Sequence, residues 1–197
     1  MVSCFSLNAF ESHSLADQSS SALMDRVDTK YLIDAAELNQ CLAELTAEYT
    51  VLEMNGCRGM AYDTLYFDTP GRQLYLDHHN GKLNRVKVRT RHYRATGERF
   101  LEVKVKTNKL RTSKQRMVLT GAEPDARILR HFLQEQLGLP ATRMLPALFV
   151  HYHRITLLSR TGHERVTVDT DICFEHSGEH QRIGLPGVVL VEVKSLR

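Results

Sequence analysis

The stretch Arg85-Val86-Lys87-Val88-Arg89-Thr90-Arg91 places a cation at every second residue and a small β-branched residue between each pair. Because a β-strand sends successive side chains to opposite faces, this stretch predicts a strand with one aliphatic and one basic face. The same alternation, with an occasional carboxylate, recurs in Arg26–Ile33, Glu102–Lys106, Arg165–Asp169 and Glu192–Lys194. Several strands therefore share a basic face, and a strongly anionic ligand is expected on it.

A simpler interpretation is that these charges only face water, since antiparallel sheets often leave one face solvated. A merely solvated face usually mixes Thr, Ser, Gln and charges of both signs. Here long cations dominate three neighbouring segments, which favours a binding site over a solvated surface.

The composition sets further limits. With 197 residues and 42% hydrophobic content, the chain can bury one sizeable core, and we expect a single domain. The net charge is +3 and the isoelectric point about 8.7, which is too mild for a general nucleic-acid coat. The basic residues therefore matter through their clustering.

The sequence shows neither a targeting signal nor a cysteine motif. No apolar run approaches the roughly 20 residues that span a bilayer, and the N-terminus lacks the order of a secretory signal, so we expect a cytoplasmic protein without a membrane segment. The four cysteines are scattered without a C-x-x-C pair, which indicates neither a zinc cage nor a disulfide framework. We expect Cys41 to lie in the core.

The N-terminal half predicts an arm, strands and one helix. Residues 1–22 are Ser-rich and weakly patterned, and we expect an arm anchored by apolar side chains. The expected anchors are Phe5, Leu7, Phe10 and Leu15. Asp34 and Glu37 form a capping-box-like pair that predicts a helix from Asp34 to about Ala47. Strands are predicted at 26–33, 49–54 and 61–67, the last closed by the turn signal Asp68-Thr69-Pro70-Gly71.

The remaining residues, 82–197, predict a β-meander, a helix and a final set of strands. Three consecutive strands are expected within 82–119, with turns around 95–97 and 108–110. A helix over 124–137 should face Ile128, Leu129, Phe132, Leu133 and Leu137 inward and stop at Gly138 and Pro140. Strands follow at 147–158, 165–174 and 188–196. We predict an α+β fold with a closed antiparallel β-barrel of about eight strands and a few flanking helices, because closure removes exposed edges.

Eight motifs, in order, resemble the VTC (vacuolar transporter chaperone) polyphosphate polymerase domain of the triphosphate tunnel metalloenzyme superfamily. They are Arg26-Val-Asp-Thr-Lys30-Tyr31, Tyr66-Phe67-Asp68-Thr69-Pro70, Arg85-Val-Lys-Val-Arg89-Thr-Arg91-His-Tyr93, Leu101-Glu102-Val-Lys104, Lys114-Gln-Arg116, Tyr152-His-Arg154, Arg165-Val-Thr-Val-Asp169 and Val191-Glu192-Val-Lys194. The resemblance covers about residues 20 to 197, so we expect an arm over 1–22 and one tunnel domain over 23–197.

The resemblance implies a β-tunnel whose cations grip a triphosphate or polyphosphate, with a carboxylate-held Mn²⁺ or Mg²⁺. The implied phosphate-binding residues are Lys30, Arg89, Arg91, Lys104, Lys114, Arg116, Arg154, Arg165 and Lys194, and Arg85 and Lys106 share the same basic faces. Those expected to act in catalysis are Arg89, Arg91, Lys104, Arg154 and Lys194. Glu192 is the first metal candidate, and Glu102 and Asp169 are second choices that could instead orient a lysine.

The chemistry suits these residue types. Phosphoryl transfer depends on alignment and charge neutralisation rather than on a protein nucleophile. Arginine binds phosphate oxygens with a planar fork and lysine supplies a point charge. The chain has no G-x-x-x-x-G-K-[ST] loop and no G-x-G-x-x-G, the usual nucleotide cradles. The pairs His78-His79 and His151-x-His153 are not expected to bind metal, although His78 could donate to phosphate from a tunnel mouth.

The sequence therefore predicts a metal-dependent polyphosphate polymerase that transfers the γ-phosphate of ATP to a growing chain. A triphosphatase or polyphosphatase acting on a triphosphate or pyrophosphate in the same site is an alternative. A non-catalytic polyphosphate or nucleotide sensor is another. Single-strand nucleic-acid binding is disfavoured, because the residues between the cations are Val and Thr rather than stacking aromatics.

Overall fold

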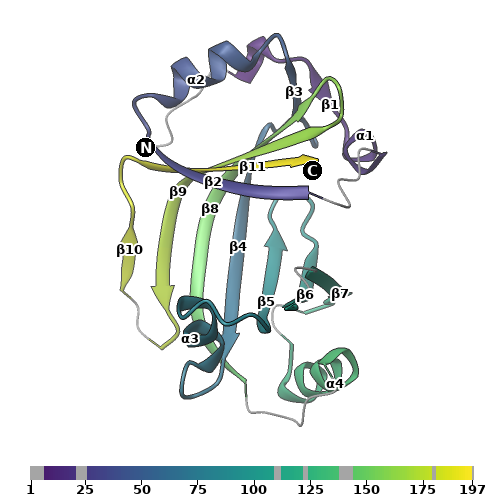
Figure 1. Ribbon diagram of the computed structural model, residues 1–197, viewed down its shortest axis with the longest axis vertical. Helices are drawn as coiled ribbons and strands as arrows, with labels where there is room; N and C mark the ends of the chain where they lie inside the picture. The colour runs from purple at the N-terminus through teal and green to yellow at the C-terminus, as the bar shows by residue number, and fades with distance from the viewer. Residues whose placement is uncertain are drawn as a thin grey trace. The chain divides into compact units, whose positions relative to one another are not determined.

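The computed structural model describes residues 7–20, 26–108, 112–121, 124–137, 144–178 and 181–196. Within these ranges the chain is mostly antiparallel sheet with few helices, which confirms the α+β class (Figure 1). The strands are β1 (Ser12–His13), β2 (Arg26–Asp34), β3 (Tyr49–Leu52), β4 (Gly59–Asp68), β5 (Arg85–Tyr93), β6 (Arg99–Lys106), β7 (Thr112–Val118), β8 (Leu145–Ser159), β9 (Glu164–His176), β10 (Arg182–Gly184) and β11 (Val188–Leu196). The helices are η1 (Leu7–Ala9), α1 (Leu15–Ser20), α2 (Leu38–Leu45), α3 (Gln73–His79) and α4 (Ala126–Leu137).

Hydrogen bonds order the main strands as β2-β11-β9-β8-β4-β5-β6-β7. The short strand β1 pairs in parallel with β3, and β10 pairs with β9. Among the described residues no strand pairing joins the last strand of this order to the first, so the closed barrel is not confirmed. In the part of the chain that the structure describes, no helix is both long and apolar enough to cross a bilayer.

The described residues form two compact units. Unit 1 comprises the described residues of 7–62, 151–173 and 183–196, and unit 2 comprises those of 63–150 and 174–182. The strands β4, β8, β9 and β10 contribute residues to both units. The division of the chain into an arm and a single tunnel domain stays a prediction.

In unit 1, β11 is the central strand and pairs with β2 and β9 in antiparallel register. Glu192 lies opposite Lys30 on one side and Thr167 on the other, and Lys194 lies opposite Asp28 and Arg165. The intervening valines of β11 pack into an apolar cluster with strand and helix residues. The alternation therefore divides the sheet as the sequence predicts, with the charged side chains on the face away from this cluster.

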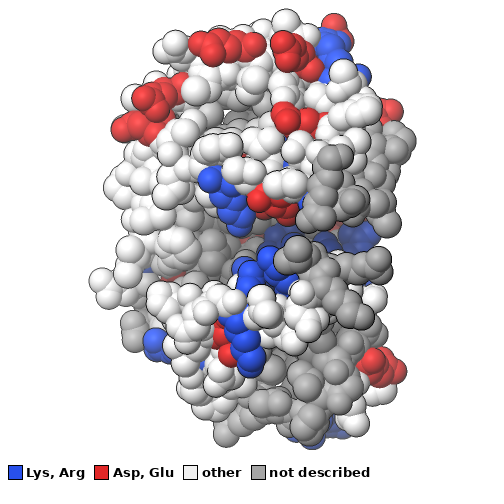
Figure 2. All heavy atoms as spheres, viewed as in Figure 1, with Lys and Arg blue, Asp and Glu red and all other residues white. Residues whose placement is uncertain are grey.

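Helix α2 supplies much of the cover of the unit 1 core. Leu38 and Leu42 are buried in the apolar cluster, and Figure 2 shows carboxylates over this helix. The prediction for Cys41 is wrong, because its side chain is exposed. At 3.6 residues per turn Cys41 lies roughly 60° from Leu38 around the helix axis, which places it at the solvent edge of the apolar stripe.

The predicted start of this helix is also wrong. The Asp34 carboxylate accepts a hydrogen bond from the Ala36 backbone N–H at 2.8 Å and caps a turn. The helix begins only at Leu38, and Glu37 occupies the N-cap position without a side-chain cap. Aspartate favours a turn of this kind as readily as a helix start, so the pattern alone does not separate the two.

The predicted arm is tied to unit 1 where the structure describes it. Phe10 is only 3% exposed and lies in the apolar cluster, and Leu7 packs against it. Leu15, in contrast, is 51% exposed, so its role as an anchor is wrong. The strand β1 adds backbone pairing with β3, so side-chain burial is only part of what holds this segment.

Unit 2 contains the predicted meander β5-β6-β7. Arg89 lies opposite Glu102, and Glu102 lies opposite Arg116 in the next strand. The aliphatic residues between them pack into a second apolar cluster that includes Val88, Leu101 and Val103. This face carries the core, and the other face carries the charges.

Helix α4 covers this second apolar cluster. Leu129, Phe132 and Leu133 are buried as predicted, whereas Ile128 is 44% exposed. Ile128 lies about 90° from the centre of the stripe formed by the other three, so its prediction as an inward residue is wrong. The side chain of Leu137 and the stop at Gly138 and Pro140 lie outside what the structure describes, as do Cys4, Phe5 and most of the turn at 108–110.

The short helix α3 is not predicted from the sequence. The turn signal at Asp68 is confirmed, but the Asp68 carboxylate also accepts hydrogen bonds from the backbone N–H groups of Leu74 and Tyr75, each at 2.9 Å. These bonds satisfy N–H groups that a helix start leaves unpaired. Arg72 precedes the helix with a positive φ of 55°, which ends the turn.

Candidate phosphate-binding site

The basic face of unit 2 arises because charged side chains occupy every second position along three adjacent strands. Arg85, Lys87, Arg89 and Arg91 alternate along β5, and the strand register sets them beside the charged residues of β6 and β7. The charged residues contributed by β6 and β7 are Glu102, Lys104, Lys106, Lys114 and Arg116. Glu102 is the single carboxylate among the described residues of this face. The site residues predicted on these strands are therefore brought together.

Glu102 is the centre of an ion-pair network. Its side chain is 0% exposed, and one oxygen accepts from Arg89 Nε at 2.8 Å and lies 2.7 Å from Arg89 Nη2. Arg91 Nη1 lies 4.0 Å from this same oxygen, and Lys114 pairs with the other one. Burial by itself raises the pKa of Glu102, but these three cations outweigh it and lower the pKa to about 2. Glu102 is thus a fixed negative charge that orients its neighbours.

Lys104 lies next to this network without a carboxylate of its own. In the strand register it stands opposite Lys87 on one side and Lys114 on the other. Burial is the main cause that lowers the pKa of Lys104 to about 8, and the neighbouring Arg89, Lys114 and Arg91 act in the same direction. This face carries more cations than its one carboxylate can neutralise, which is the electrostatic condition for binding an anion.

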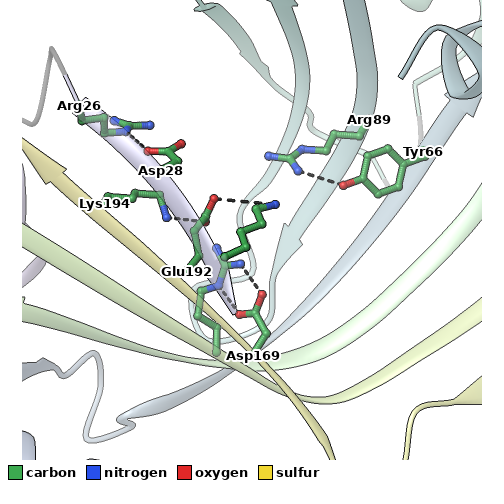
Figure 3. Close-up of polar contacts among 9 residues, drawn as sticks. Arg26, Asp28, Tyr66, Arg89, Asp169, Glu192 and Lys194 are labelled. Atoms are coloured by element: carbon green, nitrogen blue, oxygen red, sulfur yellow. Dashed lines mark hydrogen bonds and ion pairs between the residues drawn. The ribbon is translucent and has the colours of Figure 1, made fainter. Parts of the chain in front are cut away.

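Aromatic side chains hold several of these arginines. Arg89 Nη1 donates to the Tyr66 hydroxyl at 3.2 Å, as Figure 3 shows, and Arg116 stands 4.8 Å from the Phe100 ring centroid. Burial raises the pKa of Tyr66, but Arg89 and two further cations reverse this and lower it. Tyr66 belongs to one of the eight motifs, but the sequence does not predict it as a site residue. Its hydrogen bond to Arg89 depends on how β4 and β5 pair, which the alternation does not reveal.

The charged face of unit 1 is more evenly balanced. Lys194 Nζ donates to Glu192 at 2.5 Å, and Lys30 Nζ lies 3.9 Å from the other Glu192 oxygen (Figure 3). Arg26 Nε donates to Asp28 at 2.8 Å, and Figure 2 shows basic and acidic side chains next to each other over β2. Burial raises the pKa of Glu192, but the two lysines and Arg154 lower it overall.

Arg154 makes contacts with one carboxylate and two tyrosine rings within unit 1. It donates two hydrogen bonds to Asp169, both of 2.6 Å, and its guanidinium lies 5.5 Å from the Tyr62 ring centroid and 5.1 Å from that of Tyr152. The two tyrosine rings stack at 5.3 Å. Burial opposes the charged form, but the bonds to Asp169 raise the pKa of Arg154 above its ordinary value. Tyr62 is missed from the sequence because nothing in its local pattern sets it apart from a core residue.

Arg165 lies at the end of the unit 1 face beneath the N-terminal segment. Its Nη2 donates to the Gln18 backbone carbonyl at 2.9 Å, whereas its buried Nε has no hydrogen-bond partner among the described residues. Burial, and then Arg26, lower the pKa of Arg165. The predicted residues of this unit are thus Lys30, Arg154, Arg165 and Lys194, with Glu192 and Asp169.

The three metal candidates differ in what remains free to bind an ion. Glu102 is enclosed by cations, and both Asp169 oxygens accept from Arg154. The Glu192 side chain is 18% exposed and is the candidate best able to face a ligand. Over the described ranges no group of three or more His, Cys, Asp and Glu is arranged to hold a metal. The two oxygens of Glu192 face Lys194 Nζ at 2.5 Å and Lys30 Nζ at 3.9 Å, and its role as a ligand of Mg²⁺ or Mn²⁺ stays a prediction.

The fold and this site define the class of the protein. It is an α+β protein built on a mostly antiparallel sheet, with alternating cations on the face opposite its apolar clusters. The family model of the VTC domain matches residues 25–196. The chain belongs to the VTC domain family, which confirms the resemblance predicted from the motifs.

Solved structures support the fold. A putative adenylate cyclase from Vibrio parahaemolyticus is 13% identical with a TM-score of 0.51, covering 89% of this chain and 78% of that one. A putative adenylyl cyclase from Hippeastrum, HpAC1, described as having a dominant triphosphatase activity, is 13% identical with a TM-score of 0.52. That match covers 87% of this chain and 80% of HpAC1. No curated protein sequence matches this chain.

Proposed function

We propose that this protein is a triphosphate-tunnel enzyme that acts as a metal-dependent polyphosphate polymerase, with ATP and inorganic polyphosphate as substrates. The rolling of its sheet into a closed barrel is part of the proposal. Membership of the VTC family and the likeness to tunnel-fold proteins support it. The cations that the strand register brings together on β5, β6 and β7 of unit 2 support it independently.

The observation that carries the proposal is the surplus of cations around Glu102. Arg89 and Lys114 share this one carboxylate, while Lys104 stands among cations. Partly buried like charges repel strongly unless an opposite charge compensates them. A chain of linked phosphates supplies several negative charges in one molecule, which can compensate several adjacent cations at once.

In the proposed reaction, a terminal phosphate oxygen of the growing chain attacks the γ-phosphorus of ATP. A new P–O bond forms, the bond between the γ-phosphorus and the bridging oxygen breaks, and ADP leaves with that oxygen. The role of Arg89 and Arg91 is to bind non-bridging oxygens, since each guanidinium offers a planar fork. Lys104 neutralises charge that builds up on the transferred group. In unit 1, Glu192 would hold a divalent ion, which supplies Lewis-acid charge to phosphate oxygens when bound.

The second candidate uses the same residues with water as the nucleophile and makes the protein a triphosphatase. The activity stated for HpAC1 favours this alternative, since that protein shares the fold. The third candidate is a sensor that binds polyphosphate or nucleotide without turnover. Product identity separates the three, because the polymerase makes polymer and ADP, the hydrolase makes orthophosphate and ADP, and the sensor makes no product.

The test is to incubate the purified protein with ATP and either Mn²⁺ or Mg²⁺ and to measure polymer, ADP and orthophosphate in the same sample. Polymer together with ADP is expected. Orthophosphate without polymer assigns the hydrolase, and tight ATP binding without product assigns the sensor. If the wild-type chain binds neither ATP nor tripolyphosphate, the proposed function is wrong in all three forms.

A matched pair of variants tests the site itself. Lys104→Met keeps the length of the side chain and removes its charge, and it is expected to weaken tripolyphosphate binding roughly 10- to 100-fold, the range for a hydrogen bond to a charged group. Arg130→Met removes an exposed cation on α4 of the same unit and should leave binding unchanged. Equal losses in both variants would point to general electrostatic attraction rather than to this site.

A further inference from the structure

His78 and His79 are neighbours in sequence but lie in different surroundings. Both end α3, which packs against β5. His79 is exposed and stacks on Tyr75, with their ring centroids 5.8 Å apart. His78 is half-buried and follows Leu74 by one helical turn, and Leu74 packs against the apolar cluster of unit 2. His78 is therefore the more enclosed of the two histidines, at the end of a helix that packs against β5.

The charges that act on His78 are mostly positive. Arg85 and Lys87 come from β5, and Lys106 comes from β6, where it stands opposite Arg85 in the strand register. The opposing charge is Asp77, whose carboxylate is already bound by Lys82 at 3.0 Å and by Gln73 at 2.7 Å. Burial first, and then Lys87 and Arg85, lower the pKa of His78 to about 4. The imidazole is therefore neutral at neutral pH.

Several polar groups in this cluster lack partners. Among the described residues, no hydrogen bond involves a ring nitrogen of His78, and no ion pair or hydrogen bond involves the Lys106 ammonium. Arg85 Nη1 donates to the Lys82 carbonyl at 2.8 Å, but its buried Nε has no partner in the same ranges. Buried donors are almost always paired in proteins, so the buried Arg85 Nε indicates a missing acceptor. With Lys106 opposite Arg85 in the register, this end of β5 and β6 has the composition of an anion site.

We propose that His78 is a further ligand of the phosphate chain, binding an oxygen held by Arg85 and Lys106 and taking up a proton as it does so. This inference rests on the proposed function, because it extends the same basic face to a fourth element, α3. A phosphate group placed among these cations reverses the local potential. It then accepts hydrogen bonds from the imidazolium, the lysine and the free Arg85 Nε.

The proposal predicts a measurable proton uptake. If bound phosphate restores the pKa of His78 from about 4 to an ordinary value near 6.5, roughly three-quarters of a proton is taken up per site at pH 6. The same linkage makes binding about 30-fold tighter at pH 5 than at pH 8 through His78 alone. The pKa of His78 is lower in the free protein than in the complex. Binding of tripolyphosphate therefore tightens as pH falls through the pKa that His78 has in the complex.

The experiment is calorimetric titration of the full chain with tripolyphosphate at pH 6, in two buffers of different protonation enthalpy. Proton uptake is compared between wild type, His78→Asn and His79→Asn. Wild type and His79→Asn are expected to take up the same number of protons, and His78→Asn about three-quarters of a proton fewer. Protonation of tripolyphosphate itself is common to all three and cancels. Equal uptake in wild type and His78→Asn would overturn the proposal.

A second measurement needs no variant to fold. The imidazole of His78 is titrated by NMR in the wild-type chain with and without tripolyphosphate, and its pKa is expected to rise from about 4 to about 6.5 on binding. Binding without a change in this pKa would refute the role of His78 and leave the proposed function standing. Failure of wild type to bind tripolyphosphate at all would remove the proposed function together with this extension of it.

Discussion

The substitution Glu102→Gln tests most directly how the basic face is held together. It keeps the size of a side chain that is 0% exposed and removes the charge shared by Arg89 and Lys114. The pKa of Glu102 is lowered from 4.5 to about 2, a difference worth about 3 kcal/mol of folding free energy at pH 7. We expect the variant to be less stable by about that amount, in the range found when one partner of a buried ion pair is removed.

The pH dependence gives the sign of the effect. A carboxylate with a lowered pKa stabilises the folded state above its unfolded pKa, and this contribution is lost as pH falls through the folded pKa. The difference between wild type and Glu102→Gln should therefore shrink from about 3 kcal/mol at pH 7 to about 1 kcal/mol at pH 3. Urea denaturation at the two pH values measures it.

A matched control is Glu98→Gln, which removes an exposed carboxylate from the same unit and should change stability by less than about 0.5 kcal/mol. Tripolyphosphate is expected to recover part of the stability lost in Glu102→Gln, since it supplies negative charge to the same cations and binds only the folded state. A loss for Glu102→Gln that is as large at pH 3 as at pH 7 would refute the assignment of an ion-pair network.

Three further predictions follow from other features of the site and the fold. Because the pKa of Lys104 is about 8, tripolyphosphate affinity should fall as pH rises through 8 and above, and Lys104→Arg, which stays charged, should abolish that fall in a binding titration. Arg154→Lys cannot keep two bonds to Asp169 or the contact with two tyrosine faces, so thermal or urea denaturation should show a loss of about 1 to 3 kcal/mol. Cys41→Ser should change stability by less than about 0.5 kcal/mol, because the thiol is exposed.

Each of these predictions has its own contrary result. Parallel pH profiles for wild type and Lys104→Arg would show that another group titrates. An Arg154→Lys variant as stable as wild type would mean that the bidentate pair contributes little. A loss of stability in Cys41→Ser would indicate that the Cys41 side chain packs in the core.

Much of the fold could be predicted because local patterns determine it. The strands β4, β5, β6 and β11 lie where alternation predicted them, and the buried stripe of α4 follows helical spacing. Errors occur at the start of a helix and at the edge of an apolar stripe, where the same residue type is compatible with two structures. Asp34 caps a turn instead of a helix, and Ile128 falls beyond the edge of its apolar stripe.

By itself the sequence determined which side chains share a face, because a strand has a period of two whatever it pairs with. It also carried the family, through motifs whose order and spacing survive in the linear chain. Only the tertiary structure decided which charges neutralise one another. Register sets Glu102 between Arg89 and Arg116, and α3 packs against β5, because those contacts join residues whose separation along the chain has no fixed period.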